Sequence, residues 1–306
     1  MNILSKISTL DFIRYILALQ NSSINKLIQK LPSINIFSFC TLLKYPKIKN
    51  LFSIIFFILQ CFHSKAQDSL LSIKCSQIKV DNIGNIYAVN NGVITKYFTN
   101  HQTKTFSIKT FGTLANIDVS NALRILLYFN DFQKILFLDS QLSQNGDVIE
   151  LSNLGYEQTL LVCSSFNNGF WIYHQANNEL IRFNQSLEIS IKTGNLKRIL
   201  AQDIRPNFML EHNGKLYLNS PNIGILLFDI YGSYLKTIPL KNLNSFQIHY
   251  PYIFYLKDTT FYSYSIETFE TLEITTIPPN CKNLLYIGKN CYWHFDDYIK
   301  INQCIK

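Results

Sequence analysis

The sequence contains none of the short motifs that identify the commonest enzyme classes. It has no G-x-x-x-x-G-K-[ST] phosphate loop, no G-x-G-x-x-G dinucleotide fingerprint and no H-E-x-x-H metalloprotease helix. It also lacks a C-x-x-C pair and the G-x-S-x-G turn of α/β-hydrolases. Each motif works through fixed residue types at a fixed spacing, so these mechanisms have no support in this chain. The other features of the sequence indicate where the protein is located and how it folds, and they indicate no reaction.

A hydrophobic stretch long enough to cross a membrane is missing as well. The longest apolar run, LFSIIFFILQCF at 51–62, has 12 residues, whereas a helix that spans the bilayer core needs about 20. This length is typical of the hydrophobic region of a secretory signal, and the lysine cluster at 44–49 suits its basic region. The alternative is a buried core helix, which the flanking charge disfavours.

Small residues follow this run at the spacing of a signal-peptidase site. Ser64 and Ala66 occupy positions −3 and −1 of a cleavage site between Ala66 and Gln67. We therefore predict a secretory signal peptide over 44–66, and an exported chain that is periplasmic, extracellular or associated with the outer membrane.

Two features of this region leave alternatives open. The segment ILQC, ending at Cys61, resembles a bacterial lipobox, but Gln60 stands where such motifs have a small residue. A surface lipoprotein anchored through Cys61 is therefore the minority interpretation. The hydrophobic region also begins only at residue 51, which is late for a signal. Residues 1–43 are thus either an unusual N-terminal extension or the product of a misassigned start.

The part that follows the predicted signal has almost no excess of either charge. Residues 1–66 hold eight of the 28 Lys and Arg and one of the 20 Asp and Glu, which leaves 20 basic and 19 acidic residues in 67–306. The net charge of +8 for the whole chain would otherwise suggest nucleic acid or an anionic membrane as a partner. Because the basic excess lies in the leader, a nucleic-acid role for the remaining domain has no support.

Residues 67–306 do contain a repeated phrase of short strands. An apolar strand, a Gly or Asn turn, a strand with Tyr or Trp, a second turn and a third strand follow one another in that order. The equivalent positions of the second strands are Tyr87, Leu127, Trp171, Tyr217, Tyr255 and Tyr292. The steps between them are 40, 44, 46, 38 and 37 residues.

A period near 40 residues with several strands per unit is typical of a β-propeller blade. We predict an all-β, six-bladed β-propeller of four-stranded antiparallel blades, in which the first strand of each unit lines the central axis. A β-sandwich also has short, regularly spaced strands, but it would not repeat one phrase six times. The sixth unit has no fourth strand of its own, and we expect the strand at 69–74 to pair with it and close the ring.

Some of these repeats resemble known propellers. DNIGNIY at 81–87 and NGKLYLNSPNIGILLFD at 213–229 resemble repeats of the NHL and related six-bladed propellers. The pattern NIDVSN…LRILLYFNDF within 116–132 is similar to uncharacterised secreted β-propellers of Gram-negative bacteria. The resemblance covers most of 67–306 and implies the fold and export, and it implies no particular activity.

Cysteine is scarce in the predicted domain, and the number is odd. The five residues are Cys75, Cys163, Cys281, Cys291 and Cys304. Cys291 should face residue 302 across paired strands, which makes Cys304 a diagonal neighbour at about 7–8 Å, beyond comfortable disulfide geometry. We therefore expect core thiols in preference to a Cys291–Cys304 bridge, with Cys163 as a small buried hydrophobe.

Binding residues are expected on the face that carries the turns between second and third strands and the connections between blades. The candidates are Asp131, His174, Arg198, Asp203, Arg205 and Asp258. Ordinary turn chemistry is the alternative explanation for most of them. The connection at 191–206 is long for a link between blades, so we expect a helical turn or two and a functional loop there. The alternative is a lid that packs Leu196, Ile199 and Leu200 over the channel.

Some six-bladed propellers are metal-dependent lactonases that use carboxylates converging on the axis. The acids that could serve here are Asp118 and Glu211 on inner strands and Asp203 just before one. The inner strands are otherwise apolar or neutral, whereas a hard cation takes about six to eight oxygen ligands. We therefore predict no catalytic residue, metal or cofactor, and keep a hydrolase or lactonase with Ca²⁺ or Zn²⁺ as the alternative.

The leading hypothesis is an exported, non-catalytic binding or scaffold protein of the bacterial cell envelope. An aromatic-rich, nearly neutral domain without a catalytic constellation suits a rigid recognition platform. The expected partner is a protein, peptide or glycan.

Overall fold

The computed structural model describes residues 69–304. The predicted extension at 1–43, the signal peptide at 44–66, the cleavage site at Ala66 and Gln67, and Cys61 all lie outside the described residues. Within 69–304, no helix has the length and apolarity needed to cross a membrane.

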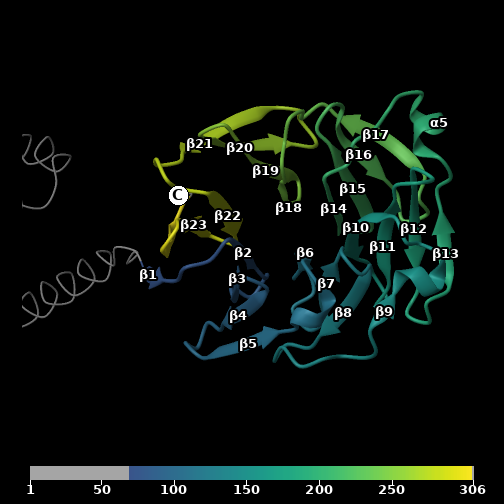
Figure 1. Cartoon of the computed structure of the whole chain (residues 1–306). Coiled ribbons are helices and arrows are strands. Elements are labelled where there is room, and N and C mark those ends of the chain that lie inside the picture. Colours follow the sequence, from purple (N-terminus) through teal and green to yellow (C-terminus); the bar gives the residue numbers. More distant parts are fainter. Residues whose placement is uncertain (1–68, 305–306) are drawn as a thin grey trace, which may run out of the picture. The chain divides into compact units, whose positions relative to one another are not determined.

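The described residues form six four-stranded antiparallel sheets arranged as blades around an axis (Figure 1). Blade 1 consists of β2 (Gln77–Val80), β3 (Ile86–Asn90), β4 (Val93–Tyr97) and β5 (Thr103–Ser107). Blade 2 consists of β6 (Leu114–Asp118), β7 (Ile125–Phe129), β8 (Lys134–Leu138) and β9 (Ile149–Glu150). Blade 3 consists of β10 (Thr159–Ser164), β11 (Phe170–His174), β12 (Glu179–Phe183) and β13 (Ile189–Lys192).

The second half of the ring repeats this arrangement. Blade 4 consists of β14 (Phe208–His212), β15 (Lys215–Ser220), β16 (Gly224–Phe228) and β17 (Tyr234–Ile238). Blade 5 consists of β18 (Gln247–His249), β19 (Tyr252–Lys257), β20 (Thr260–Ser265) and β21 (Thr271–Thr276). Blade 6 consists of β22 (Asn283–Ile287), β23 (Asn290–His294), β24 (Tyr298–Gln303) and β1 (Ser69–Ser72). The predicted six-bladed β-propeller is confirmed.

The hydrophobic core is divided among the seams between blades. The second and third strands of blades 2, 3 and 4 are almost fully buried, as in ILLYF of β7 and FWIYH of β11, because their side chains on both faces pack against a neighbouring blade. Six clusters of buried residues result, each of which joins two adjacent blades. The outer strands are more exposed, as in TKTFS of β5 and ISIK of β13.

The ring closes through β1, as predicted from the sequence. β1 pairs antiparallel with β24, so that Leu71 faces Ile299 and Ser72 faces Tyr298. Leu71 packs into the core between blades 6 and 1, whereas its neighbour Leu70 points outward and is 64% exposed. This pairing covers an edge of β24 that would otherwise stay unpaired.

The last blade also contains a disulfide between Cys291 of β23 and Cys304, so the expectation of core thiols for these two residues is wrong. Cys291 does face Asn302, as the register predicted. Cys304, however, follows the end of β24 at Gln303 and is not held at a diagonal position of the sheet, and the two Cα atoms lie 5.3 Å apart. Cys75, Cys163 and Cys281 are buried thiols, as expected for Cys163.

Candidate functional site

The first strands of the six blades surround a central cavity of about 850 Å³, as the sequence predicted. Its walls are formed by β2, β6, β10, β14, β18 and β22, which converge in the middle of the ring (Figure 1). The wall is mixed in character: Phe208, Leu210 and Leu285 lie beside Lys79 and Asp118. We refer to this cavity as the axial channel.

The predicted candidate Asp118 joins blade 2 to blade 3. Its carboxylate accepts the Ser164 backbone N–H at 2.7 Å and the Ser120 N–H at 2.9 Å. Two residues earlier, the Asn116 amide donates to the Val162 carbonyl oxygen at 2.9 Å. Inner strands of adjacent blades belong to different sheets, so their inward backbone groups need partners from side chains. Asp118 meets that need.

Glu211 has the same role between blades 4 and 3. Its carboxylate accepts the Trp171 Nε1–H at 2.7 Å, the Phe166 backbone N–H at 3.0 Å and the Ser165 hydroxyl. Arg182 extends the network by donating Nε–H to the Ser165 hydroxyl at 2.7 Å. Three donors converge on one carboxylate, which therefore holds two blades together.

The third acid of the alternative metal site, Asp203, lies elsewhere. It forms an exposed ion pair with Lys197 at 2.6 Å, and its carbonyl accepts the amide of Asn222 in the turn between β15 and β16. Glu211 stands next to the opposite end of β15, so the three acids do not converge. Within 69–304, no three His, Cys, Asp or Glu side chains are placed to hold a metal ion. Asp118, Asp203 and Glu211 therefore do not fit a divalent-cation cage.

The other predicted binding residues are distributed over separate blades. Asp131 accepts the Thr113 N–H at 2.8 Å and contacts Gly112 so closely that a Cβ there would come within 2.7 Å of the Asp131 Cβ. His174 is buried with its ring edge-on to Tyr156 at 5.2 Å, and burial lowers its pKa. Asp258 occupies a turn at a φ of 54°. Asp131 and Asp258 thus have turn roles.

The long connection at 191–206 contains the predicted helical turn, α5 (Leu196–Leu200). Leu196 is fully buried, and Leu200 partly so, in the core between blades 3 and 4, whereas Ile199 is 48% exposed. The lid alternative is thus wrong: the anchoring leucines fill a seam between blades. Arg198 and Arg205 are exposed on this connection, near the Lys197–Asp203 pair.

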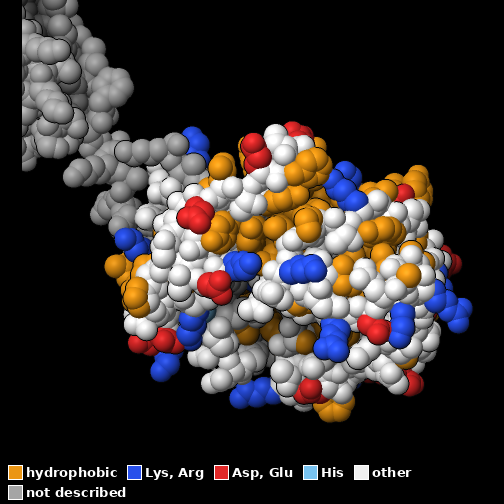
Figure 2. Space-filling model, turned by 90° about the horizontal axis from the view of Figure 1, so that it is seen from above, with side chains coloured by type: hydrophobic (Ala, Val, Ile, Leu, Met, Phe, Trp, Pro, Cys, Tyr) orange, Lys and Arg blue, Asp and Glu red, His pale blue; other side chains and the backbone are white. Residues whose placement is uncertain are grey.

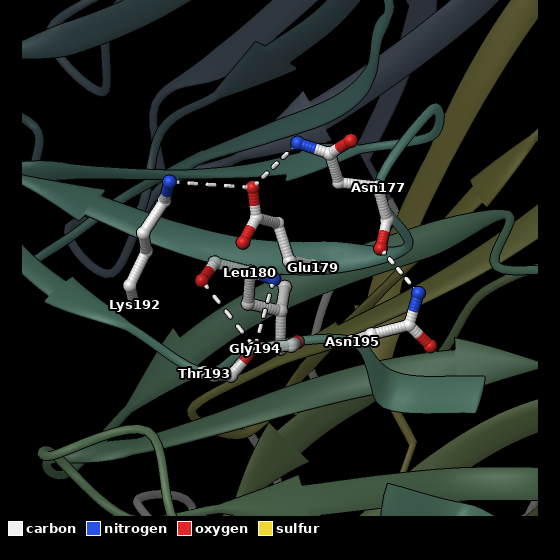
Figure 3. A network of polar contacts seen from close by, with 7 residues as sticks. All are labelled: Asn177, Glu179, Leu180, Lys192, Thr193, Gly194 and Asn195. Carbon is white, nitrogen blue, oxygen red and sulfur yellow. Dashed lines mark hydrogen bonds and ion pairs between the residues drawn. The ribbon is translucent and has the colours of Figure 1, made fainter. Parts of the chain in front are cut away.

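Polar contacts fix the start of this connection to the turn between β11 and β12 (Figure 3). The Asn195 amide donates to the Asn177 carbonyl oxygen at 2.8 Å, and the Leu180 N–H donates to the Thr193 hydroxyl at 3.0 Å. Glu179 accepts from the Asn177 amide at 3.0 Å and pairs with Lys192 at 3.6 Å. The start of the connection is therefore held in place against blade 3 by these contacts.

Lys79 also belongs to the channel wall, a position that the sequence did not predict. Its ammonium lies 5.5 Å from the centroid of the Phe208 ring on blade 4, across the axis from its own blade 1. Burial lowers the pKa of Lys79, and the charge of Asp118 partly opposes that effect. The one sequence signal for it is a lysine between the apolar Ile78 and Val80 on a first strand.

A second missed feature is a set of exposed hydrophobic side chains on the face opposite the predicted one. This face carries the turns between first and second strands and between third and fourth strands, and we call its exposed set the apolar turn face. The residues are between 39% and 74% exposed: Ile83, Leu123, Phe166, Tyr231, Tyr250, Tyr252 and Phe269. They come from five consecutive blades.

Further hydrophobic side chains are exposed on the outer strands. Figure 2 looks onto the edge of the ring where β17, β20 and β21 lie, and shows hydrophobic side chains gathered there among scattered charges of both signs. Tyr234 and Leu235 of β17 and Leu272 of β21 are exposed. The mixed charges agree with the near-neutral composition of this part of the chain.

No protein-family model and no curated protein matches the sequence. Virginiamycin B lyase from Staphylococcus aureus is similar in structure, with a TM-score of 0.53, 12% identity and coverage of 79% of this chain and 100% of that chain. A streptogramin B lyase structure is similar with a TM-score of 0.53 and 14% identity, and the match covers 79% of this chain and 88% of that chain. The extracellular domain of a putative one component system from B. thetaiotaomicron is similar with a TM-score of 0.50 and 14% identity, and the match covers 74% of this chain and 32% of that chain. At these identities the likeness shows the fold alone.

Proposed function

We propose that this protein is an exported, non-catalytic β-propeller that binds a protein partner of the cell envelope through the apolar turn face. The observation that carries the proposal is the gathering of seven exposed large hydrophobic residues, three of them tyrosines, on one side of the ring. Large hydrophobic side chains exposed on one face of a folded domain are candidates for a protein contact, and tyrosine and phenylalanine are enriched at protein interfaces.

Export is supported by the Cys291–Cys304 disulfide, since structural disulfides persist in oxidising compartments outside the cytosol. The predicted signal peptide agrees with it, and so does the occurrence of the same fold in an extracellular domain. Intact-mass analysis of the native protein tests this part directly. A mature chain that starts at Gln67 supports cleavage, an acylated Cys61 supports the lipoprotein alternative, and an unprocessed reduced chain contradicts export.

The absence of catalysis is supported by what the axial acids do. Asp118 and Glu211 accept hydrogen bonds that join neighbouring blades, which gives both carboxylates a structural role. Lyases share this fold, so the fold by itself decides nothing about activity. Stoichiometric Ca²⁺ or Zn²⁺ in the purified protein would contradict the non-catalytic proposal and restore the hydrolase alternative.

The partner surface is tested with a photo-crosslinking phenylalanine analogue. The analogue replaces Phe269 on the apolar turn face or, as a matched control, Phe132, which is similarly exposed in the turn between β7 and β8 on the opposite face. Recovery of a specific envelope protein from position 269 and not from position 132 is the expected result. Crosslinking only from position 132 would move the binding surface to the opposite face.

A further inference from the structure

Lys79 points into the axial channel because of the alternation of β2. Ile78 and Val80 are buried in the core between blades 6 and 1, so the residue between them faces the opposite way, toward the cavity. The side chain is long enough for its ammonium to reach within 5.5 Å of the Phe208 ring centroid on blade 4.

The charge of this ammonium is not compensated by an ion pair. Within the described part of the chain, Lys79 Nζ has neither a carboxylate within ion-pair distance nor a hydrogen-bond acceptor, and the Phe208 ring is its one close polarisable contact. The negative charge of Asp118 raises the pKa of Lys79 and so favours its ammonium form. Both oxygens of Asp118, however, are engaged by the backbone N–H groups of Ser120 and Ser164.

Lys79 is half-buried, so its ammonium is solvated less well than in bulk water and has no anionic partner in the wall to make up the difference. Burial accordingly lowers the pKa of Lys79. An anion entering the channel would remove this penalty and gain a charge-assisted contact.

Apolar side chains of blades 4 and 6 line part of the cavity, in a wall that elsewhere carries polar and charged residues. Phe208 and Leu210 of β14 line the cavity from blade 4, and Leu285 and Ile287 of β22 line it from blade 6. A cavity of about 850 Å³ falls within the range of about 300–1,000 Å³ that small-molecule sites occupy. An ammonium without an ion-pair partner beside apolar side chains favours an organic anion over an inorganic one.

We propose that the axial channel binds an organic carboxylate, whose anionic head pairs with Lys79 and whose apolar part lies against Phe208 and Leu210. The carboxylate belongs either to a free small acid or to the C-terminus of a peptide, since both present the same group. This site is separate from the apolar turn face and does not depend on the function proposed for that face.

Isothermal titration of the full chain with 3-phenylpropionate tests the proposal, with the neutral 3-phenyl-1-propanol as the matched ligand. We expect saturable binding of the acid in the millimolar range or tighter, and binding of the alcohol weaker by about tenfold or more. This comparison uses the unmodified protein, so it holds whatever the stability of any variant. Equal affinities, or no saturable binding of the acid, would overturn the proposal.

Two variants locate the site. Lys79→Met removes the ammonium and keeps an unbranched apolar stem that reaches as far as Cε, and it is expected to weaken acid binding at least about tenfold. Lys104→Met, on the exposed strand β5, is expected to leave it unchanged. Unaltered binding in Lys79→Met would place the carboxylate elsewhere and refute the assignment.

The source of the carboxylate is distinguished with a tripeptide that ends in phenylalanine, as the free acid and as the C-terminal amide. If the peptide acid binds more tightly than 3-phenylpropionate and the peptide amide does not bind, the channel is assigned to the C-termini of peptides. Tighter binding of 3-phenylpropionate assigns it to free acids. Equal binding of the peptide acid and its amide would contradict recognition of a carboxylate.

Discussion

Leu71 of β1 lies directly opposite Ile299 of β24, so the first strand of the described chain completes the blade that contains the last one. The pairing is non-covalent, because the disulfide of this blade joins Cys291 to Cys304 and leaves β1 untouched. The attachment of β1 to blade 6 therefore depends on the backbone ladder of four residue pairs and on the burial of Leu71.

Leu71→Asp is expected to lower the free energy of unfolding by about 2 kcal/mol or more, because it removes apolar burial and places a charge in the seam between blades 6 and 1. Urea denaturation followed by circular dichroism measures the change. Leu70→Asp in the same strand, on its exposed face, is the control and should change stability by less than about 0.5 kcal/mol. Equal effects of the two variants would show that β1 does not close the ring as described.

Glu211→Gln is expected to destabilise the protein by about 1–3 kcal/mol. The amide nitrogen of glutamine is a donor, and it would face one of the donors of Ser165, Phe166 or Trp171 that the carboxylate now accepts. Glu273→Gln on the exposed strand β21 is the control, measured in the same denaturation experiment. An unchanged stability together with an altered metal content would reverse the structural role given to Glu211.

Cys304→Ser is expected to lower the free energy of unfolding by about 2–4 kcal/mol, since the disulfide closes a short loop between β23 and the end of β24. Reductant should lower the stability of the parent protein by a similar amount and should have little effect on the variant. Alkylation followed by mass spectrometry counts the free thiols independently. Five alkylated cysteines in a non-reduced chain that begins at Gln67 would show that the bridge does not form.

Stability is expected to fall as the pH is lowered below about 6.5, the ordinary pKa of histidine. Burial lowers the pKa of His294, whose Nε2 lies 3.4 Å from the Cys75 sulfur, and the nearby Lys282 lowers it further. The unfolded chain then binds the proton more readily than the folded one, so acid favours unfolding. Burial shifts the pKa of His174, His212 and His249 in the same direction.

His294→Gln stays neutral and should flatten this part of the stability curve between pH 7.5 and pH 5. His101→Asn, at an exposed turn with a φ of 67°, is the control, because asparagine tolerates that backbone conformation. A variant curve parallel to that of the parent protein would assign the acid sensitivity to other groups.

The fold was predictable because each blade needs large hydrophobic or aromatic residues at similar positions of its strands, and these residues recur in the sequence. The second-strand positions Tyr87, Trp171 and Tyr217 lie opposite Lys96, Arg182 and Leu227 of the third strands in one common register. These three and Tyr292 pack toward the following blade, whereas Leu127 and Tyr255 of the predicted set pack toward the preceding blade. The closing strand was predictable for a related reason, since the sixth unit was one strand short and an unpaired edge needs cover.

The candidate site was less predictable, because its residues are brought together by the ring and not by local spacing. Lys79 and Phe208 meet across the axis from blades half a turn apart, and no sequence pattern links them. The disulfide was missed for a local reason: strand geometry was extended to Cys304, one residue beyond the end of β24. The exposed turn residues were missed because single hydrophobic residues in turns reveal nothing until the fold places them on one face.

Closure by β1 also sets the order in which the molecule is completed. As the chain emerges from the ribosome or a secretion channel, β1 appears before every blade and its partner β24 appears after all of them. Once β24 has appeared, and until β1 pairs with it, the protein is an open arc with an unpaired edge at β24 and an unattached strand. Two such arcs could each take the β1 strand of the other, so an intertwined dimer is the misassembly expected from this architecture.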